Sequence, residues 1–305
     1  MLPSKLLYNP AAGRQRERRS HVVQGVIATL RSQGFHVESE ATRAKGSGAQ
    51  QAADAVRQGA AAVFACGGDG TVHDVLQGIA GTGASLGIIP CGSANALAQE
   101  LRIPSDPLRA ATLLHPQHSI QLRTMAVHRG DLPTLYSLCM AGAGPDGLLM
   151  YRMLTVNRGG LGRWRYYEHA LRLFCSHRFP KFQVEVQQSD GSRAEHTVVS
   201  AMGLRIGDLQ GIFRGIGRGA SIHDPSLHVI LVAPPARLTL PLWFVLAWLG
   251  LARLHPGITI CKAQALVTQE TVPLQVDGEW AGHVITAVTM AGPLQRVLTP
   301  APVQA

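Results

Sequence analysis

Apolar and polar positions in the first third of the chain follow two alternating patterns. Short runs in which nearly every residue is apolar, such as Ala61–Ala65, are typical of buried strands. Between them lie segments with apolar residues every three or four positions, such as Arg16–Gln33, which Gly34 ends. These segments predict helices with one buried face. Further helices are expected at Gly48–Gln58, Val72–Ile79 and Ser93–Leu101, and further strands at Leu6–Tyr8, Phe35–Glu38 and Leu86–Ile89.

Repeated strand–helix units predict an α/β domain with a parallel sheet and helices on both faces. Ligands of such sheets bind beyond the carboxyl ends of the strands. The loops that follow the strands are therefore where we expect a binding site.

The pattern changes near Ser119, after which strand-like runs and hairpin-like turns dominate. We expect an α/β domain with a parallel sheet over residues 1–124 and a mainly antiparallel β-sandwich domain over residues 125–300. A helical stretch, Gly147–Ser176, interrupts the second domain. The expected strands are Ser119–His128, Thr134–Ala141, Phe182–Gln187, Thr197–Ile206, Leu227–Ala233, Ile258–Val267, Leu274–Val276 and Val284–Ala291.

Composition narrows the class of protein. The 305 residues include 28 basic and 19 acidic side chains, and the net charge of +9 favours an anionic partner such as a nucleotide, an acidic lipid headgroup or a nucleic acid. Five scattered cysteines without a C-x-x-C pair indicate neither a disulfide framework nor a zinc site. No apolar signal core follows Met1, so we expect a cytoplasmic protein. Leu238–Leu254 is apolar but too short to span a bilayer, and predicts a helix that is buried or lies on a membrane.

The loop Cys66–Thr71 follows a buried strand and precedes a helix. Its glycines surround Asp69 and let the backbone approach a ligand closely, while Thr71 is expected to cap the next helix. Helix amides at such a position bind phosphate. The alternative is a tight turn that uses Gly and Asp for their turn propensity alone.

A second loop, Pro90–Ala98, has the same placement. Ser93 is expected to be an N-cap or a phosphate donor, and Asn95, inside the first helical turn, is a poor helix former with a polar amide to offer. Asn9 and Gly13 follow the first strand and Thr42 follows the second. Four consecutive strand ends should therefore converge on one cleft.

A third glycine motif matches a dinucleotide-binding pattern by sequence but not by context. Gly142–Gly147 matches the pattern G-x-G-x-x-G, and Glu168 follows at the distance typical of a dinucleotide-binding fold. The motif lies in the antiparallel half of the chain, however, and no parallel-type strand follows its helix at the usual distance. Dinucleotide binding at this loop is therefore disfavoured.

Taken together, these segments resemble the diacylglycerol kinase catalytic family, which includes sphingosine kinases, ceramide kinases and bacterial lipid kinases. The resemblance implies a lipid kinase that uses ATP and Mg²⁺, with an NAD-kinase-like α/β domain that binds ATP, a β-rich lipid-binding domain and catalysis between them. The matching segments run in family order over nearly the whole chain: Asn9–Gly13, Gly67–Val75, Pro90–Ala98 and Asp277–Glu279.

The family assigns each motif residue a role. Asp69 would act through magnesium or orient the transferring group, and Glu279 would be the general base. Asp277-Gly278 is also a standard hairpin signal, which is the alternative for this segment. Asp146 would contact the lipid headgroup or be a simple turn residue. Gly67, Gly68, Gly70, Thr71, Gly92 and Ser93 would hold the ATP phosphates, and Asn9, Gly13, Thr42 and Asn95 would position the nucleotide.

Three departures from the family pattern keep other functions open. Relatives often carry Glu at the position of Asp74, an acid near Gln121 that supports metal binding, and Asp-Gly where Asp224-Pro225 stands. The missing acid near Gln121 leaves a non-catalytic protein that binds nucleotide and lipid as one alternative. An NAD kinase-like enzyme, whose family shares the Gly-Gly-Asp-Gly loop, is the other.

Basic and aromatic residues alternate over Tyr151–Lys181. Such a segment suits an anionic membrane surface, a nucleic acid or simply a solvated helix face. A lipid substrate favours the membrane over nucleic acid, and Trp243, Phe244 and Trp248 would then reach the acyl region or pack in the core. We expect peripheral contact with an anionic membrane and no nucleic acid; the choice between monomer and homodimer stays open.

Overall fold

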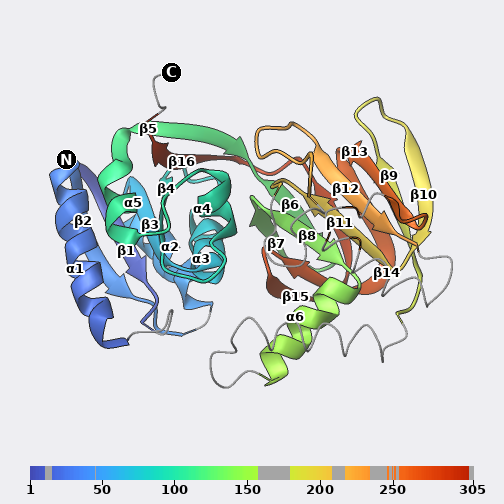
Figure 1. Ribbon diagram of the computed structural model, residues 1–305, viewed down its shortest axis with the longest axis horizontal. Coiled ribbons are helices and arrows are strands. Elements are labelled where there is room, and N and C mark those ends of the chain that lie inside the picture. Colours follow the sequence, from blue (N-terminus) through green and yellow to red (C-terminus); the bar gives the residue numbers. More distant parts are fainter. Residues whose placement is uncertain are drawn as a thin grey trace. The chain divides into compact units, whose positions relative to one another are not determined.

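A computed structural model describes residues 1–10, 16–44, 46–156, 179–207, 217–233, 246, 249, 251 and 254–301 (Figure 1). The chain forms two compact units, which are described separately. One contains Met1–Thr124 and the chain from Gly292 onward, and the other contains Met125–Ala291. The division drawn from the sequence, 1–124 and 125–300, did not include this return of the chain at Gly292.

The first unit is built on a sheet in which the described strands follow the order β2-β1-β3-β4-β16-β5. β1 to β4 are parallel, whereas β16 runs parallel to β4 and antiparallel to β5. The strands are β1 (Leu2–Tyr8), β2 (Phe35–Ala41), β3 (Ala62–Gly67), β4 (Ser85–Pro90), β5 (Leu114–Arg123) and β16 (Leu294–Pro300).

Strand order places the helices of this unit. β2 and β3 lie on opposite sides of β1, so right-handed connections put α1 (Arg16–Ser32) and α2 (Ser47–Arg57) on opposite faces of the sheet. α1 packs against α5 (Pro107–Leu113), and α2 packs against α3 (Asp69–Ile79) (Figure 1). Continuous apolar runs in the central strands therefore face helices on both sides, and Leu6 and Leu7 are both fully buried.

The second unit holds an antiparallel sheet whose described strands follow the order β13-β12-β11-β8-β14-β15-β6-β7, with β9 pairing both β10 and β14. The long strand β14 pairs with β9 through Ala265–Val267 and with β8 through Leu274–Val276, and its register with β15 shifts between these parts. The strands are β6 (Met125–Arg129), β7 (Leu132–Ser137), β8 (Met140–Ala143), β9 (Phe182–Gln187), β10 (Arg193–Val198), β11 (Ser200–Leu204), β12 (Leu227–Val232), β13 (Ile258–Ala263), β14 (Ala265–Val276) and β15 (Glu279–Thr289).

The predicted fold class, an α/β domain followed by a mainly antiparallel β domain, is confirmed. Several element bounds differ from the prediction. α3 begins at Asp69 rather than Val72, and α4 (Ala96–Glu100) is shorter than the predicted Ser93–Leu101. α6 spans Pro145–Val156, and the rest of the predicted helix to Ser176 lies outside the described residues.

None of the helices in the described ranges is both long enough and apolar enough to cross a membrane. Most of the apolar stretch Leu238–Leu254, including Trp243, Phe244 and Trp248, lies outside those ranges. The same is true of residues 157–178, which carry most of the basic and aromatic segment.

Candidate active site

Four neighbouring parallel strands end at one edge of the first sheet. Because β2, β1, β3 and β4 are adjacent and parallel, the segments that follow them lie side by side. The predicted convergence of Asn9, Thr42 and the two glycine loops is thus seen at this edge, while Gly13 lies outside the described residues. Three backbone hydrogen bonds continue the ladder beyond the strands: Thr42 N–H to Tyr8 O (2.9 Å), Asn9 N–H to Cys66 O (3.2 Å) and Cys91 N–H to Gly67 O (2.8 Å).

The Asp69 carboxylate fastens the second glycine loop to the first. Asp69 is the first residue of α3, directly after the N-cap Gly68. Its Oδ2 accepts the Asn95 N–H at 2.9 Å, and its Oδ1 accepts the Ala96 N–H at 2.6 Å. A negative charge is stabilised at helix N-termini, and here it lies at the starts of both α3 and α4. Loss of this charge would loosen the contact between the loops.

Asn95 closes its own loop. It precedes α4 in a left-handed conformation (φ 52°), which Asn tolerates better than most residues, so its predicted place inside the helix is wrong. The side-chain Oδ1 accepts the Gly92 N–H at 2.9 Å, and Nδ2 donates to Gly92 O at 3.0 Å. The Gly92 N–H, which was expected to reach phosphate, is therefore engaged within the loop.

The two loops touch through backbone atoms. A Cβ on Gly92 would lie 2.5 Å from the Gly68 Cα, and a Cβ on Gly68 would lie 3.2 Å from the Gly92 Cα. The first distance is too short for any side chain, so glycine at position 92 is required by close approach.

Neither hydroxyl residue of the loops caps a helix, so the cap predicted for Thr71 is wrong, and of the two roles predicted for Ser93 the N-cap is not seen. Gly68 is the N-cap of α3, and Thr71 lies buried in the first helical turn. Ser93 is exposed and precedes Asn95, which is the N-cap of α4. Ser93 is thus accessible to a ligand, whereas Thr71 lies against Gly67.

In the second unit, Glu279 follows a two-residue hairpin turn. Asp277 (φ 50°) and Gly278 (φ 80°) join β14 to β15, and Val276 pairs with Glu279. Positive φ at both central residues is the pattern of a type I′ turn, for which Asp-Gly is favoured. The hairpin predicted as the alternative for this segment is confirmed, and it fixes the start of the strand that carries Glu279.

The Asp277 carboxylate ties this turn to the β7–β8 connection. Its Oδ1 accepts hydrogen bonds from the Ser137 hydroxyl (2.5 Å), the Cys139 N–H (3.2 Å) and the Met140 N–H (3.1 Å). The Asp277 N–H donates in return to Met140 O at 2.9 Å. The turn before Glu279 is therefore held on both sides.

Gln275 links this turn to Asp146. Its Oε1 accepts the Gly278 N–H at 2.8 Å, and its Nε2 donates to Asp146 Oδ2 at 3.3 Å. Sequence reasoning missed both Gln275 and Ser137. The available signal for Gln275 was a polar residue between Leu274 and Val276, both of which are fully buried.

Asp146 lies in the first turn of α6. It is therefore not the simple turn residue that was the alternative for this position. Its Oδ1 is buried and has no hydrogen-bond partner among the described residues. Burial raises the pKa of this carboxyl to about 6, although the Gln275 hydrogen bond acts in the opposite direction. The carboxyl therefore changes charge within a mildly acidic pH range.

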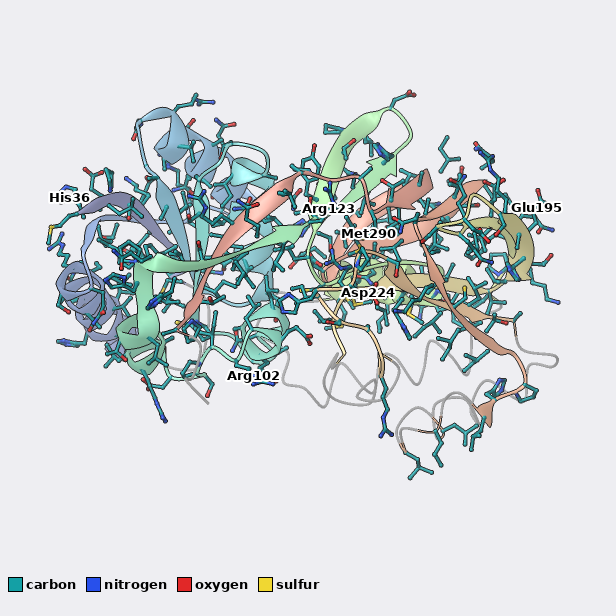
Figure 2. All side chains as sticks on the ribbon, turned by 90° about the horizontal axis from the view of Figure 1, so that it is seen from above. His36, Arg102, Arg123, Glu195, Asp224 and Met290 are labelled. Atoms are coloured by element: carbon teal, nitrogen blue, oxygen red, sulfur yellow. The ribbon has the colours of Figure 1, made fainter. Side chains whose placement is uncertain are left out.

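The acid at Asp224, where the chain departs from the family pattern, is engaged inside the second unit (Figure 2). Burial alone would raise its pKa, but hydrogen bonds from Lys262 and Ser226 lower it to about 2. The buried Arg205 guanidinium also interacts electrostatically with Asp224. This carboxylate is thus a charged partner in a local network.

No group of three or more His, Cys, Asp or Glu side chains in the described part of the chain could hold a metal ion. A magnesium ion that is carried by nucleotide phosphates keeps several waters and needs only one or two carboxylates. Asp69 supplies one carboxylate beside the loops. The residues fit a nucleotide-borne ion and do not form a metal cage.

Comparison with known proteins points to one family. Residues 3–127 match the diacylglycerol kinase catalytic domain. A diacylglycerol kinase of Staphylococcus saprophyticus is 25% identical over 285 residues, covering 92% of this chain and 90% of that protein. One from Staphylococcus carnosus is 24% identical with the same coverage. Residues 3–127 thus resemble a diacylglycerol kinase catalytic domain, and the chain is similar to diacylglycerol kinases over nearly its whole length. These similarities indicate a lipid kinase, that is, a phosphotransferase with an alcohol acceptor.

Solved structures agree on the fold. A diacylglycerol kinase from Bacillus anthracis superposes with a TM-score of 0.71 at 19% identity, covering 99% of this chain and 98% of that chain. The fold of this chain thus has a solved counterpart over nearly its full length.

The described part of the second unit contains a small apolar cavity between its strands. Ala143, Phe182, Leu266 and Val288 contribute to its lining. With about 10 Å³ of volume, it has room for roughly one water molecule and not for an acyl chain. An acyl chain would therefore bind elsewhere or displace these side chains.

Proposed function

We propose that this lipid kinase transfers the γ-phosphoryl group of ATP to the hydroxyl of a diacylglycerol, a sphingoid base or a related lipid. The nucleotide half of the proposal rests on one observation: the Asp69 carboxylate accepts hydrogen bonds from two backbone amides of the second glycine loop. It holds two glycine-rich loops together where two neighbouring strands end, which is the arrangement that phosphoryl transfer requires for positioning.

On the nucleotide side, the backbone of Gly67, Gly68 and Gly70 would lie against the phosphates, with Thr71 and Ser93 as hydroxyl donors. The Gly92 N–H is engaged by Asn95 and would not bind phosphate. Gly92 would instead allow the close approach of the two loops. Asn9, Thr42 and Asn95 would position the nucleotide, and Gly13 is assigned the same role from the family pattern. Asp69 would hold a magnesium ion carried by the phosphates, and that ion would neutralise charge on the transferring group.

On the acceptor side, Glu279 would accept the proton of the lipid hydroxyl as general base. The Asp277 turn fixes the backbone at this residue, which supports the assignment. Asp146 would contact the polar headgroup, since its buried Oδ1 leaves an acceptor without a partner in the described residues. The net charge of +9 supports a cytoplasmic protein in peripheral contact with an anionic membrane.

The decisive experiment uses γ-labelled ATP with vesicles that contain diacylglycerol or sphingosine, and with NAD as a soluble acceptor. We expect labelled lipid and no NADP. Labelled NADP would favour the NAD kinase-like alternative, and ATP binding without any labelled product at any magnesium concentration would favour a non-catalytic protein.

Two pairs of variants test the residue roles. Asp69→Asn should lower the rate by about 100-fold or more, because one of two amide acceptors and the charge are lost. Asp54→Asn, in the last turn of α2 and therefore at the opposite end of the sheet, is its control. Glu279→Gln should lower the rate at least as much, whereas Glu195→Gln on β10 (Figure 2) should not. An unchanged rate in Asp69→Asn would overturn the proposal.

A further inference from the structure

Two cysteines lie at the starts of the two glycine loops. Cys66 is the next-to-last residue of β3, and Cys91 directly follows β4. Their sulfur atoms are 3.7 Å apart. The backbone holds them there, because Gly67 pairs with Pro90 and accepts the Cys91 N–H at 2.8 Å. Cys66 is buried and Cys91 is partly exposed.

We propose that Cys66 and Cys91 form an oxidisable pair that a hydroperoxide converts into a disulfide. The partly exposed Cys91 sulfur attacks the peroxide first: an S–O bond forms, the O–O bond breaks, and sulfenic acid and water (or an alcohol) result. The Cys66 sulfur then attacks the sulfenic sulfur, so the S–S bond forms, the S–O bond breaks and the hydroxyl leaves as water with the Cys66 proton. The two thiols lose two electrons, and the peroxide gains them.

The pair is suited to this reaction by position. A disulfide has sulfurs about 2.05 Å apart, so the two atoms must approach by roughly 1.7 Å. Cys91 lies in a loop beyond the strand and is the more exposed partner, which suits it to move and to meet the oxidant first. Cys139 and Cys261 belong to the other unit, and burial raises the pKa of the Cys261 thiol, which lowers its reactivity.

The consequence for nucleotide binding rests on the proposed function. Cys66 immediately precedes Gly67 and Gly68, and Cys91 immediately precedes Gly92. Gly68 and Gly92 are already in backbone contact, so drawing the two sulfurs together must displace one loop against the other. The same movement disturbs the Asp69 hydrogen bonds to Asn95 and Ala96. Oxidation should therefore reversibly abolish phosphate binding at the loops.

The first test reads the chemistry alone. The full chain is treated with hydrogen peroxide, remaining thiols are alkylated, and a non-reducing digest is analysed by mass spectrometry. We expect a peptide pair joining Cys66 to Cys91 that has lost two hydrogen atoms and separates on addition of a dithiol. Cys91→Ser and Cys66→Ala should each abolish this product, and Cys261→Ser should retain it. Oxygen adducts on Cys91 without the cross-linked pair would overturn the proposal.

The second test reads the consequence in the same samples. ATP binding and lipid phosphorylation should fall by about 100-fold after oxidation, because a displacement of about 1 Å in a binding site has effects of that size. A dithiol should restore both, and Cys91→Ser should keep both in peroxide. A cross-link without any change in ATP affinity would refute the claim that the disulfide controls nucleotide binding at the loops. Reduced protein that neither binds ATP nor phosphorylates lipid would instead refute the proposed kinase function, while the mass result would still decide the cross-link.

Discussion

One side chain, Asp277, organises the turn that precedes Glu279. Its carboxylate receives one hydroxyl and two backbone amides, and its own backbone occupies the left-handed region. Asp is chosen here for two independent reasons: it tolerates positive φ better than most residues, and an ionised carboxylate binds amides strongly. A residue of the family motif therefore has a structural role that does not depend on the reaction.

We expect Asp277→Ala to lower the free energy of unfolding by about 3 kcal/mol, since two amides and a hydroxyl lose their charged acceptor. Asp277→Asn should lose less, because it keeps one acceptor and tolerates the same φ. Urea denaturation measures both. Asp131→Ala, in the exposed β6–β7 turn, is the control and should change stability by no more than about 0.5 kcal/mol. An Asp277→Ala variant as stable as the control would refute the role of the turn.

Asp146 should make stability depend on pH in a defined direction. Its pKa is about 6 in the folded protein and 3.8 in a free side chain. Between these values the folded state keeps a proton that the unfolded state releases, so the free energy of unfolding falls as pH rises through this window. The full penalty is present above about pH 6 and absent below about pH 4.

Asp146→Asn removes this penalty while keeping an acceptor for Gln275. At pH 7.5 the variant should be more stable than the parent chain by about 3 kcal/mol, and at pH 4 most of the difference should be gone. Paired denaturation curves at the two pH values give the difference directly and cancel the titration of all other groups. A variant destabilised more at pH 7.5 than at pH 4 would show that the surroundings stabilise the carboxylate, and an equal change at both values would show that the pKa of Asp146 is not raised.

At the level of elements, the two glycine loops act as one unit. The second loop contains too little regular structure to hold its own shape, because α4 has five residues. The loops are instead fixed by the backbone contact at Gly68 and Gly92 and by the Asp69 carboxylate. Their geometry is thus set by tertiary contacts.

Gly92→Ala should disrupt this unit. The added Cβ would meet the Gly68 Cα at 2.5 Å, and a backbone atom cannot rotate away as a side chain can. We expect a loss of about 2 kcal/mol in stability, or an equivalent loss of ATP affinity if the loops separate to make room. Gly203→Ala is a matched control, because its Cβ meets only side-chain atoms, the nearest at 3.5 Å. Unchanged stability and ATP affinity in Gly92→Ala would mean that the contact is not required.

The elements that the sequence predicted well are those with strong local signals. The buried strand ending in Gly67, the amphipathic helix α1 and the Asp277-Gly278 hairpin all follow from periodicity or turn chemistry. The start of α3 and the position of Asn95 could not be predicted in the same way. Asp69 and Asn95 bond to each other across 26 positions, and such a contact leaves no periodic trace in the sequence.

At the scale of the whole molecule, the first unit is discontinuous. β16 enters its sheet between β4 and β5, and Val297 is fully buried and pairs with both neighbours. Thr124 donates through its N–H and its hydroxyl to Pro293 O, which holds the two ends of the unit together. Local sequence cannot reveal such a pairing, because the partners are separated by the entire second unit.

The last prediction follows from this topology. Residues 1–124 alone should not fold, because β4 and β5 would be left without the strand that lies between them and Gln295 would no longer reach Ala84 O. Joining Thr124 to Gly292 with a short Asn-Gly linker closes a β5–β16 hairpin and should restore a cooperative unfolding transition, measured by circular dichroism and urea denaturation. The same linked chain with Val297→Asp should remain unfolded, whereas Leu294→Asp, at a half-exposed position of the same strand, should be tolerated. Cooperative unfolding of residues 1–124 without β16 would contradict the assignment of the C-terminal strand to the core of the first unit.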